Sequence, residues 1–322
     1  IGGTMKQFSG LSRTIQGNHL LDTCAIDILK IGHRPLVLCA KQEYNTTVES
    51  FVKVLTCYGP IVKIAYMEEW DQNSVEEYGE FGFRHRADHI IGIGNSSIAA
   101  CTKAVADLLD LPAVLIPTSP FTTLPWVSVE NKKRERPLFN ESIQLIIADR
   151  KQLLTQPTSE LINGVVNTLL YLAAIKEVKR NHLFSLVDDI LIRGFESVLL
   201  RGSLQAIEDF EARILSKEVQ DVLEVLSTCV TLDLPSDAWD VIQQIESKLS
   251  ERREYLVDEP LKRNVVLYLL LTYLTQESEE FQVRLKWCQQ LLLSANSSNL
   301  LSLEAVFKEI ALEIGEDCST RC

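Results

Sequence analysis

"DHIIGIGNSSIAACTKAVADLL", residues 88–109, combines an apolar run, a Gly-x-Gly turn and a run of small residues with helical periodicity. The apolar run predicts a buried strand, and the residues after it predict a helix. A glycine turn that leads into a helix can bind phosphate, because the first N–H groups of the helix have no partner within it. Gly-x-Gly without a third glycine is also common in tight turns, so the stretch alone leaves both interpretations open.

The composition is that of a globular protein of two domains. The chain has 322 residues, of which 46% are apolar and 24% charged. Its formal net charge of −12 argues against a nucleic-acid partner. The most apolar run, "VVLYLLLTYL" (265–274), has about half the length of a membrane span. It therefore predicts a buried helix, and no membrane partner is expected.

The cysteines and the first residues favour a cytoplasmic location. None of the eight cysteines forms a C-x-x-C pair, and most lie in apolar surroundings, where a free thiol behaves as a small buried group. The chain opens without the charged and apolar regions of a secretory signal, and Met5 is the expected native start. A reducing cytoplasm is the expected compartment.

The first half of the chain alternates strand and helix patterns. This alternation predicts βαβ units, a parallel sheet and helices on both of its faces. Strands are predicted at 34–40, 61–67, 88–94, 112–118 and 143–149, and helices at 46–59, 73–86 and 97–110.

The second half shows only helical periodicity. Helices are predicted at 159–180, 185–200, 203–232, 236–256, 261–274 and 303–315. The predicted fold class is thus an α/β Rossmann-like parallel sheet followed by an all-α helical domain. The expected domains are a nucleotide-binding domain at 5–152 and a helical domain at 153–322.

Two loops are expected at the same edge of the sheet, because ligands of doubly wound sheets bind beyond the carboxyl ends of the strands. One is the glycine turn, with Ser97 as the expected N-cap of the next helix. The other is "PTSPFTTLPWVSV" (117–129), which is either a second lip of a nucleotide cleft or a proline-stiffened surface loop. The predicted cofactor-binding residues are Gly92, Gly94, Asn95, Ser96, Ser97, Thr118 and Thr122.

Residues 87–129 resemble the corresponding stretch of the glycerol dehydrogenases, in the iron-containing alcohol dehydrogenase superfamily. Fainter similarity covers "TIQGN" (14–18), like the family's opening hairpin, "LIIADRK" (145–151), like its last strand, and "NGVVNTLLYLAA" (163–174), like the first helix of its helical domain. The resemblance implies NAD(H) in an interdomain cleft, one Zn²⁺ or Fe²⁺ between the domains, and a homodimer formed through the N-terminal domain.

The metal ligands that the resemblance implies are missing here. The family uses one Asp and two His, but all five histidines of this chain precede residue 183. The Asp position falls on Asn167, and the His positions fall on Asp237 and Asp258. A catalytic zinc site needs three protein ligands, so no catalytic zinc or iron is expected. An Asn/Asp/Asp set could still hold a hard cation through oxygen ligands.

Positions that would contact the cofactor also differ. An Asp that follows the family's glycine turn is replaced by Ala100. The carboxylate expected near the adenosine ribose falls on Ala40 or Lys41, and Lys41 would favour NADP if it is not simply solvated. NAD, NADP or neither therefore stays open.

Two functions follow as hypotheses. The first is a divergent glycerol dehydrogenase-like protein without metal-dependent hydride transfer, which still binds a dinucleotide or phosphorylated ligand in the cleft. The alternative is an active NAD(P)-dependent oxidoreductase that acts on a polyol or hydroxy acid with an altered metal requirement. It would need a proton acceptor, and the candidates are Asp149, His182 and Tyr171.

Overall fold

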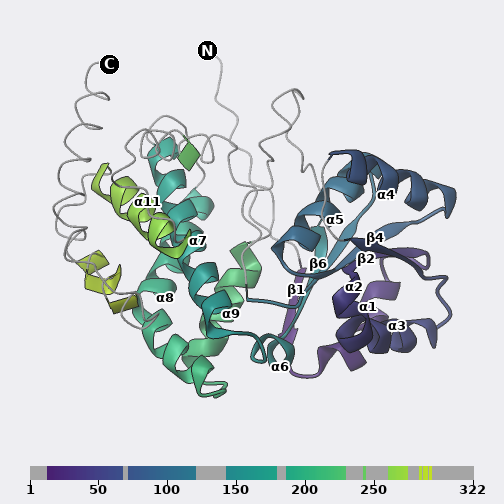
Figure 1. Cartoon of the computed structure of the whole chain (residues 1–322), viewed down its shortest axis with the longest axis horizontal. Helices are drawn as coiled ribbons and strands as arrows, with labels where there is room; N and C mark the ends of the chain where they lie inside the picture. The colour runs from purple at the N-terminus through teal and green to yellow at the C-terminus, as the bar shows by residue number, and fades with distance from the viewer. Residues whose placement is uncertain are drawn as a thin grey trace, which may run out of the picture.

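A six-stranded parallel sheet forms the first half of the computed structural model of this chain (Figure 1). The structure describes residues 13–67, 72–120, 143–179, 186–229, 242–243, 260–274, 283–284, 286–288 and 290–291. Within these residues the strand order is β1-β6-β5-β4-β2-β3, and every neighbouring pair is parallel. The strands are β1 (Arg13–Gly17), β2 (Pro35–Ala40), β3 (Lys63–Met67), β4 (His89–Gly94), β5 (Ala113–Pro117) and β6 (Ile143–Asp149).

All five predicted strands are confirmed, and β1 adds a sixth at the edge beside β6. Residues 14–18 resemble the family's opening hairpin, and in the structure residues 13–17 pair in parallel with β6. The residues before Arg13 lie outside the described part of the chain.

Helices cover both faces of the sheet, as the alternating pattern predicts. The side chains of β2 alternate between the two faces, as they must in a strand. Val37 packs with Phe51 in the core beneath α1 and α3, whereas Leu36 packs with Cys101 in the core beneath α4 and α5. The covering helices are α1 (Ala25–Leu29), α3 (Glu49–Thr56), α4 (Gln72–Arg84) and α5 (Ser96–Leu109).

The helix predicted at 46–59 begins earlier than expected, directly at the end of β2. The chain passes from α2 (Lys41–Glu43) through a π-helical turn at Tyr44–Val48 into α3. Because the helix starts early, the Glu43 side chain reaches Thr118 beyond the end of β5. One further short helical turn, η1 (Leu20–Asp22), follows β1.

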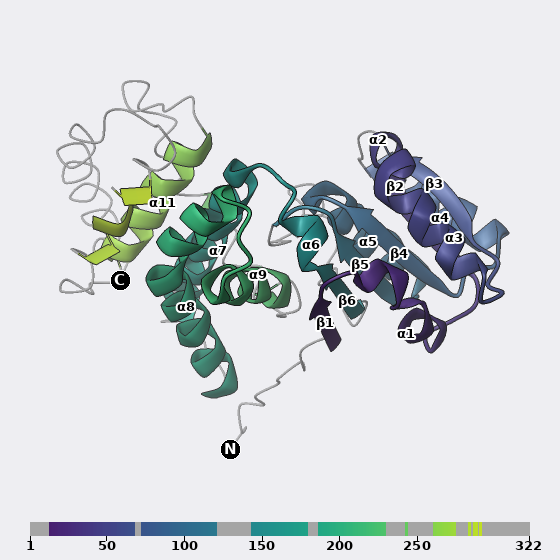
Figure 2. The same cartoon turned by 90° about the horizontal axis from the view of Figure 1, so that it is seen from below.

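The rest of the described chain is helical and lies beside the β1 edge of the sheet (Figure 2). A candidate membrane span by length and hydropathy falls on residues 158–176, but 72% of that window is buried within the structure. It is therefore placed as a core helix of a soluble protein would be. The helices are α6 (Arg150–Leu153), α7 (Thr158–Lys179), α8 (Leu186–Glu211), α9 (Lys217–Cys229) and α11 (Pro260–Leu274).

The sequence predicts a break between two helices at residues 201–202, but in the structure the break lies between Glu211 and Lys217. Helix α8 runs without a break through residues 201–202 and ends at Glu211, because Arg213 adopts a left-handed conformation with φ of 60°. Ser216 then accepts the N–H of Val219 and caps α9. Helix α11 confirms the helix predicted at 261–274. The predicted helices at 236–256 (apart from residues 242–243) and 303–315 lie outside the described residues.

Polar contacts join the sheet to the helices at the end of β6. The Asp149 carboxylate accepts N–H groups of Lys151 and Gln152, which caps α6, and its other oxygen accepts the N–H of Leu20 at 2.7 Å. The neighbouring Arg150 donates to the Gln220 side chain on α9 at 2.9 Å. The predicted domain boundary at 152–153 lies within α6 and stays a prediction.

Helix α5 lies unusually close to β4 above Gly92. A Cβ atom at Gly92 would lie 2.1 Å from the Thr102 hydroxyl oxygen and 2.9 Å from the Thr102 Cβ. Thr102 is fully buried, and its hydroxyl donates to the Ile98 carbonyl one turn earlier. Only glycine therefore permits this approach of helix to strand.

Replacing this glycine should destabilise the protein. We expect Gly92→Ala to lower the free energy of unfolding by about 1–3 kcal/mol, because the added methyl must push α5 away from β4. Gly194→Ala is the matched control, since Gly194 lies within α8 with nothing within 4 Å of an added Cβ. The control should raise the unfolding free energy by about 0.5–1 kcal/mol. Urea unfolding followed by circular dichroism measures both, and equal effects would contradict the close approach.

Candidate functional site

The strand order reverses next to β2, at the position where doubly wound sheets bind ligands. The chain passes from β2 outward to β3 and then returns to the other side of β2 to form β4. Connections on the two sides of this point leave in opposite directions, which opens the carboxyl edge of the sheet there. We call the residues at this edge, 40–43, 94–98 and 117–119, the switch edge.

The two loops that the sequence places at one edge do meet. The Thr118 N–H donates to the Gly94 carbonyl at 3.0 Å, which ties the end of β5 to the end of β4. Thr118 is buried, and the neighbouring Ser119 is buried with its hydroxyl unbonded to any group in the described part of the chain. Thr122, predicted in the same loop, lies outside the described residues.

Asn95, not Ser97, is the N-cap of α5. Asn95 has extended backbone, and its side-chain oxygen accepts the N–H groups of Ser97 at 3.1 Å and Ile98 at 3.3 Å. The helix begins two residues earlier than an N-cap at Ser97 requires, so Ser96 and Ser97 lie in its first turn. The Asn95 amide thus takes the N–H groups that a phosphate would use.

The predicted glycines occupy different places. Gly94 ends β4 at the switch edge, whereas Gly92 lies inside β4 beneath Thr102. The geometry gives Gly92 a role in packing α5 on the sheet. That any of these residues binds a cofactor stays a prediction.

Glu43 is a residue of the switch edge that the sequence reasoning missed. It ends α2, three residues after β2, and is half-buried. Its Oε1 accepts the Thr118 hydroxyl at 2.9 Å, and a Cβ atom at Gly94 would lie 2.9 Å from its Oε2. Burial raises the pKa of Glu43, and the hydrogen bond from Thr118 opposes this rise. An acidic residue just beyond a buried strand was the available signal.

The switch edge has the backbone arrangement of a dinucleotide-phosphate site, but side chains of the chain itself lie against the same backbone groups. A glycine turn, a 14-residue helix and the strand reversal have the required shape. However, the Asn95 oxygen already bonds the first N–H groups, and the Glu43 carboxylate lies against Gly94. Ala40 and Lys41, where a ribose-binding carboxylate was expected, supply no acid.

The described residues do not fit a catalytic metal ion. The side-chain oxygen of Asn167 on α7 accepts an N–H from the Asn264 side chain on α11 at 2.7 Å, and it is therefore already engaged. Across the described ranges, no three His, Cys, Asp or Glu residues lie close enough to hold a metal. Asp237 and Asp258 fall outside those ranges, so the expected loss of the metal stays a prediction.

Of the three candidate proton acceptors, one caps a helix, one lies in the core and one lies outside the described residues. The Asp149 carboxylate accepts three backbone N–H groups at the junction of β6 and α6, so it already has a capping role. Tyr171 is buried in the core of the helical part. His182 lies outside the described residues.

Lys103 is the second residue that the sequence reasoning missed. It is buried on α5, and its burial lowers the pKa of its ammonium group to about 7. It lies one turn after Ala99, which packs with Leu115 and Ile146 of β5 and β6. A lysine with such a pKa can exchange a proton near neutral pH. The lysine of "TKAVAD" was visible in the sequence, but its burial was not.

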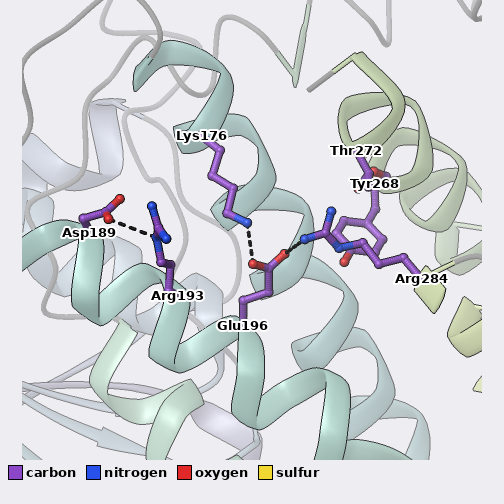
Figure 3. A network of polar contacts seen from close by, with 7 residues as sticks. All are labelled: Lys176, Asp189, Arg193, Glu196, Tyr268, Thr272 and Arg284. Atoms are coloured by element: carbon purple, nitrogen blue, oxygen red, sulfur yellow. Dashed lines mark hydrogen bonds and ion pairs between the residues drawn. The ribbon is translucent and has the colours of Figure 1, made fainter. Parts of the chain in front are cut away.

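A buried ion network connects three helical segments (Figure 3). The Glu196 carboxylate on α8 contacts Lys176 of α7 at 2.5 Å and Arg284 at 2.9 Å. Tyr268 of α11 lies beside Arg284, and burial raises the pKa of its phenol well above the usual range. Because buried charges are costly unless paired, this network specifies how the helices pack rather than forming an open site.

Solved structures with the same architecture include dehydrogenases and reductases. A probable glycerol dehydrogenase from Sinorhizobium meliloti has a TM-score of 0.71 at 18% identity, over 95% of this chain and 90% of that one. An iron-containing alcohol dehydrogenase from Thermotoga maritima has a TM-score of 0.63 at 17% identity, over 96% and 87%. A sulfoacetaldehyde reductase from Bifidobacterium kashiwanohense, solved in complex with NAD⁺, has a TM-score of 0.67 at 11% identity, over 96% and 93%.

The chain thus has the fold of these dehydrogenases and reductases. More narrowly, it has the fold of the glycerol dehydrogenases and iron-containing alcohol dehydrogenases, which confirms the resemblance at the level of architecture. At the level of sequence, no protein-family model matches the chain, and neither does any curated protein.

Lys103 should make stability depend on pH. Its folded pKa of about 7 lies below the unfolded value of about 10.4, so between these values the unfolded chain binds a proton that the native protein does not. Lys103 therefore makes the free energy of unfolding rise as the pH increases across this window. Lys103→Met removes this dependence. Between about pH 7 and about pH 9, the free energy of unfolding of the wild type should therefore rise by about 2 kcal/mol relative to that of the variant.

Urea unfolding at the two pH values measures this shift. Lys53→Met is the matched control, because Lys53 is exposed and paired with Glu49. The difference in unfolding free energy between Lys53→Met and the wild type should be the same at both pH values. A Lys103→Met variant with the same pH dependence as the wild type would show that Lys103 is charged in the native protein.

Proposed function

We propose that this chain is a divergent member of the glycerol dehydrogenase-like proteins that has lost metal-dependent hydride transfer. Asn167 carries the proposal. It stands where the resemblance expects a metal-ligating Asp, and its side-chain oxygen is engaged by Asn264. A neutral amide is a poor substitute for a carboxylate at a site that must hold Zn²⁺ or Fe²⁺. The absence of histidine after residue 182 supports the same conclusion.

We propose that the switch edge still binds a small molecule. A dinucleotide or another phosphorylated ligand is the first candidate, because the strand reversal, the glycine turn and the N-terminus of α5 meet there. One protein of this fold was solved with NAD⁺ bound. NAD and NADP are both candidates, and neither nucleic acid nor a membrane is proposed as a partner.

An active oxidoreductase is the second candidate, and Lys103 favours it. This lysine is buried and has a pKa of about 7, as a group that moves a proton at neutral pH requires. Such an enzyme would act on a polyol or hydroxy acid without the usual metal.

Metal analysis and an activity panel separate the two candidates. Protein purified from medium supplemented with zinc and iron should hold less than about 0.1 metal ion per chain, since no set of three ligands is expected. It should not oxidise polyols or 2-hydroxy acids, or reduce 2-keto acids, with either nicotinamide cofactor.

If metal and activity are found, the Asn167→Ala variant shows whether they depend on Asn167. In the proposed protein it changes neither metal content nor activity. Stoichiometric metal and polyol oxidation that are both lost in Asn167→Ala would contradict the proposal. Turnover without metal that Lys103→Met abolishes would support the second candidate instead.

We also propose a cytoplasmic homodimer. The composition and cysteine usage support the compartment, and the resemblance supports association through the N-terminal domain. A single-chain mass by light scattering would contradict the dimer.

A further inference from the structure

A carboxylate of the chain itself lies where the glycine turn would meet a phosphate. Glu43 reaches this position because α2 begins directly at the end of β2, which is the neighbour of β4 in the sheet. A Cβ atom at Gly94 would lie 2.9 Å from Glu43 Oε2, so the carboxylate rests against the residue that lacks a side chain. The Ile98 side chain lies on the same side of Gly94, at 2.5 Å from that Cβ position, so the space beside this glycine is filled by an apolar group and an acid of the same protein.

The position of Glu43 is fixed from the opposite side. The Thr118 hydroxyl donates to Glu43 Oε1 at 2.9 Å, and the Thr118 N–H donates to the Gly94 carbonyl at 3.0 Å. Thr118 is 5% exposed, so it holds the carboxylate from a buried position. Glu43, Thr118 and Gly94 thus form one connected arrangement across the ends of β2, β5 and β4.

The Asn95 side-chain oxygen is a second group of the protein that a phosphate would meet at the glycine turn. The Asn95 side-chain oxygen takes the N–H groups of Ser97 and Ile98 at the start of α5. A phosphate at this turn would have to displace a neutral acceptor from those N–H groups and also approach a negative one. Of the two, only the negative group repels an anion at a distance.

We propose that Glu43 is a specificity-determining residue of the switch edge, whose carboxylate competes with phosphate for the glycine turn and weakens the binding of phosphorylated ligands. The inference rests on the proposed function, which assigns ligand binding to this edge. Like charges close together in partly buried surroundings repel more strongly than in water. A phosphorylated ligand therefore binds only when the Glu43 side chain turns away, whereas a nucleoside without phosphate meets no such repulsion.

Isothermal titration calorimetry on the full chain tests the inference. The probes are NAD⁺, ADP and adenosine, and the proteins are the wild type, Glu43→Gln and Glu49→Gln, at about pH 8, where carboxyl groups are ionised. The glutamine introduced by Glu43→Gln keeps an oxygen to accept the Thr118 hydroxyl, so the arrangement persists without its charge. Glu49 is the matched control, because it is more exposed and pairs with Lys53 on α3.

Glu43→Gln should bind NAD⁺ and ADP at least about tenfold more tightly than the wild type does. The affinity for adenosine should change by less than about twofold, and Glu49→Gln should match the wild type for all three probes. Thermal melting of each protein shows whether the variants are folded.

The outcomes separate the inference from the proposed function. Equal or weaker binding of NAD⁺ and ADP by Glu43→Gln would overturn the inference and leave the ligand site standing. Binding by Glu43→Gln alone would support the inference and remove nucleotides as ligands of the natural protein. A folded Glu43→Gln variant that binds none of the probes would overturn the inference and the nucleotide site together.

Discussion

The close approach of α5 to β4 above Gly92 is the constraint that places the start of α5 at the switch edge. With a hydrogen atom in place of a side chain, Gly92 lets buried Thr102 pack directly on the strand. The first turn of α5 is thereby held over the end of β4. Asn95, the N-cap of α5, is thereby brought beside Gly94. At the same edge, the Thr118 N–H donates to the Gly94 carbonyl and the Thr118 hydroxyl donates to Glu43 of α2.

The switch edge has the backbone arrangement of a phosphate-binding site, but side chains of the protein itself lie at its glycine turn. Dinucleotide-binding sheets leave the N–H groups of the helix after the glycine turn available to an anion. In this chain the Asn95 amide oxygen accepts two of those N–H groups, and the Glu43 carboxylate lies beside Gly94. The same substitution of partners occurs between α7 and α11, where Asn167 pairs with Asn264. In both places, groups of the protein bond to each other at positions where the resemblance expects a ligand.

Regular features of the fold could be predicted from the sequence because they follow from apolar periodicity. Five strands, their parallel arrangement and the change to helices after Asp149 all have this origin. The end of α8 could not, because it depends on the left-handed conformation of Arg213, and arginine carries no signal for that conformation.

The candidate site was predictable only in part. The meeting of Gly94 and Thr118 follows from strand order, so the sequence indicated it. The observed cap, Asn95, lies two residues before the predicted cap, Ser97, and periodicity does not resolve so small a difference. Glu43 and Lys103 depend on burial and on contacts between distant segments: 75 residues separate Glu43 from Thr118. Their surroundings exist only in the folded chain.

Backbone amide resonances of the glycine turn test the central claim most directly. In isotope-labelled protein, the N–H signals of Asn95, Ser97 and Ile98 can be followed while pyrophosphate is added. We predict that these signals move less in the wild type than in Glu43→Gln at the same pyrophosphate concentration, because in the variant no carboxylate opposes the anion. Equal movement in both proteins, at the same pyrophosphate concentrations, would contradict this claim.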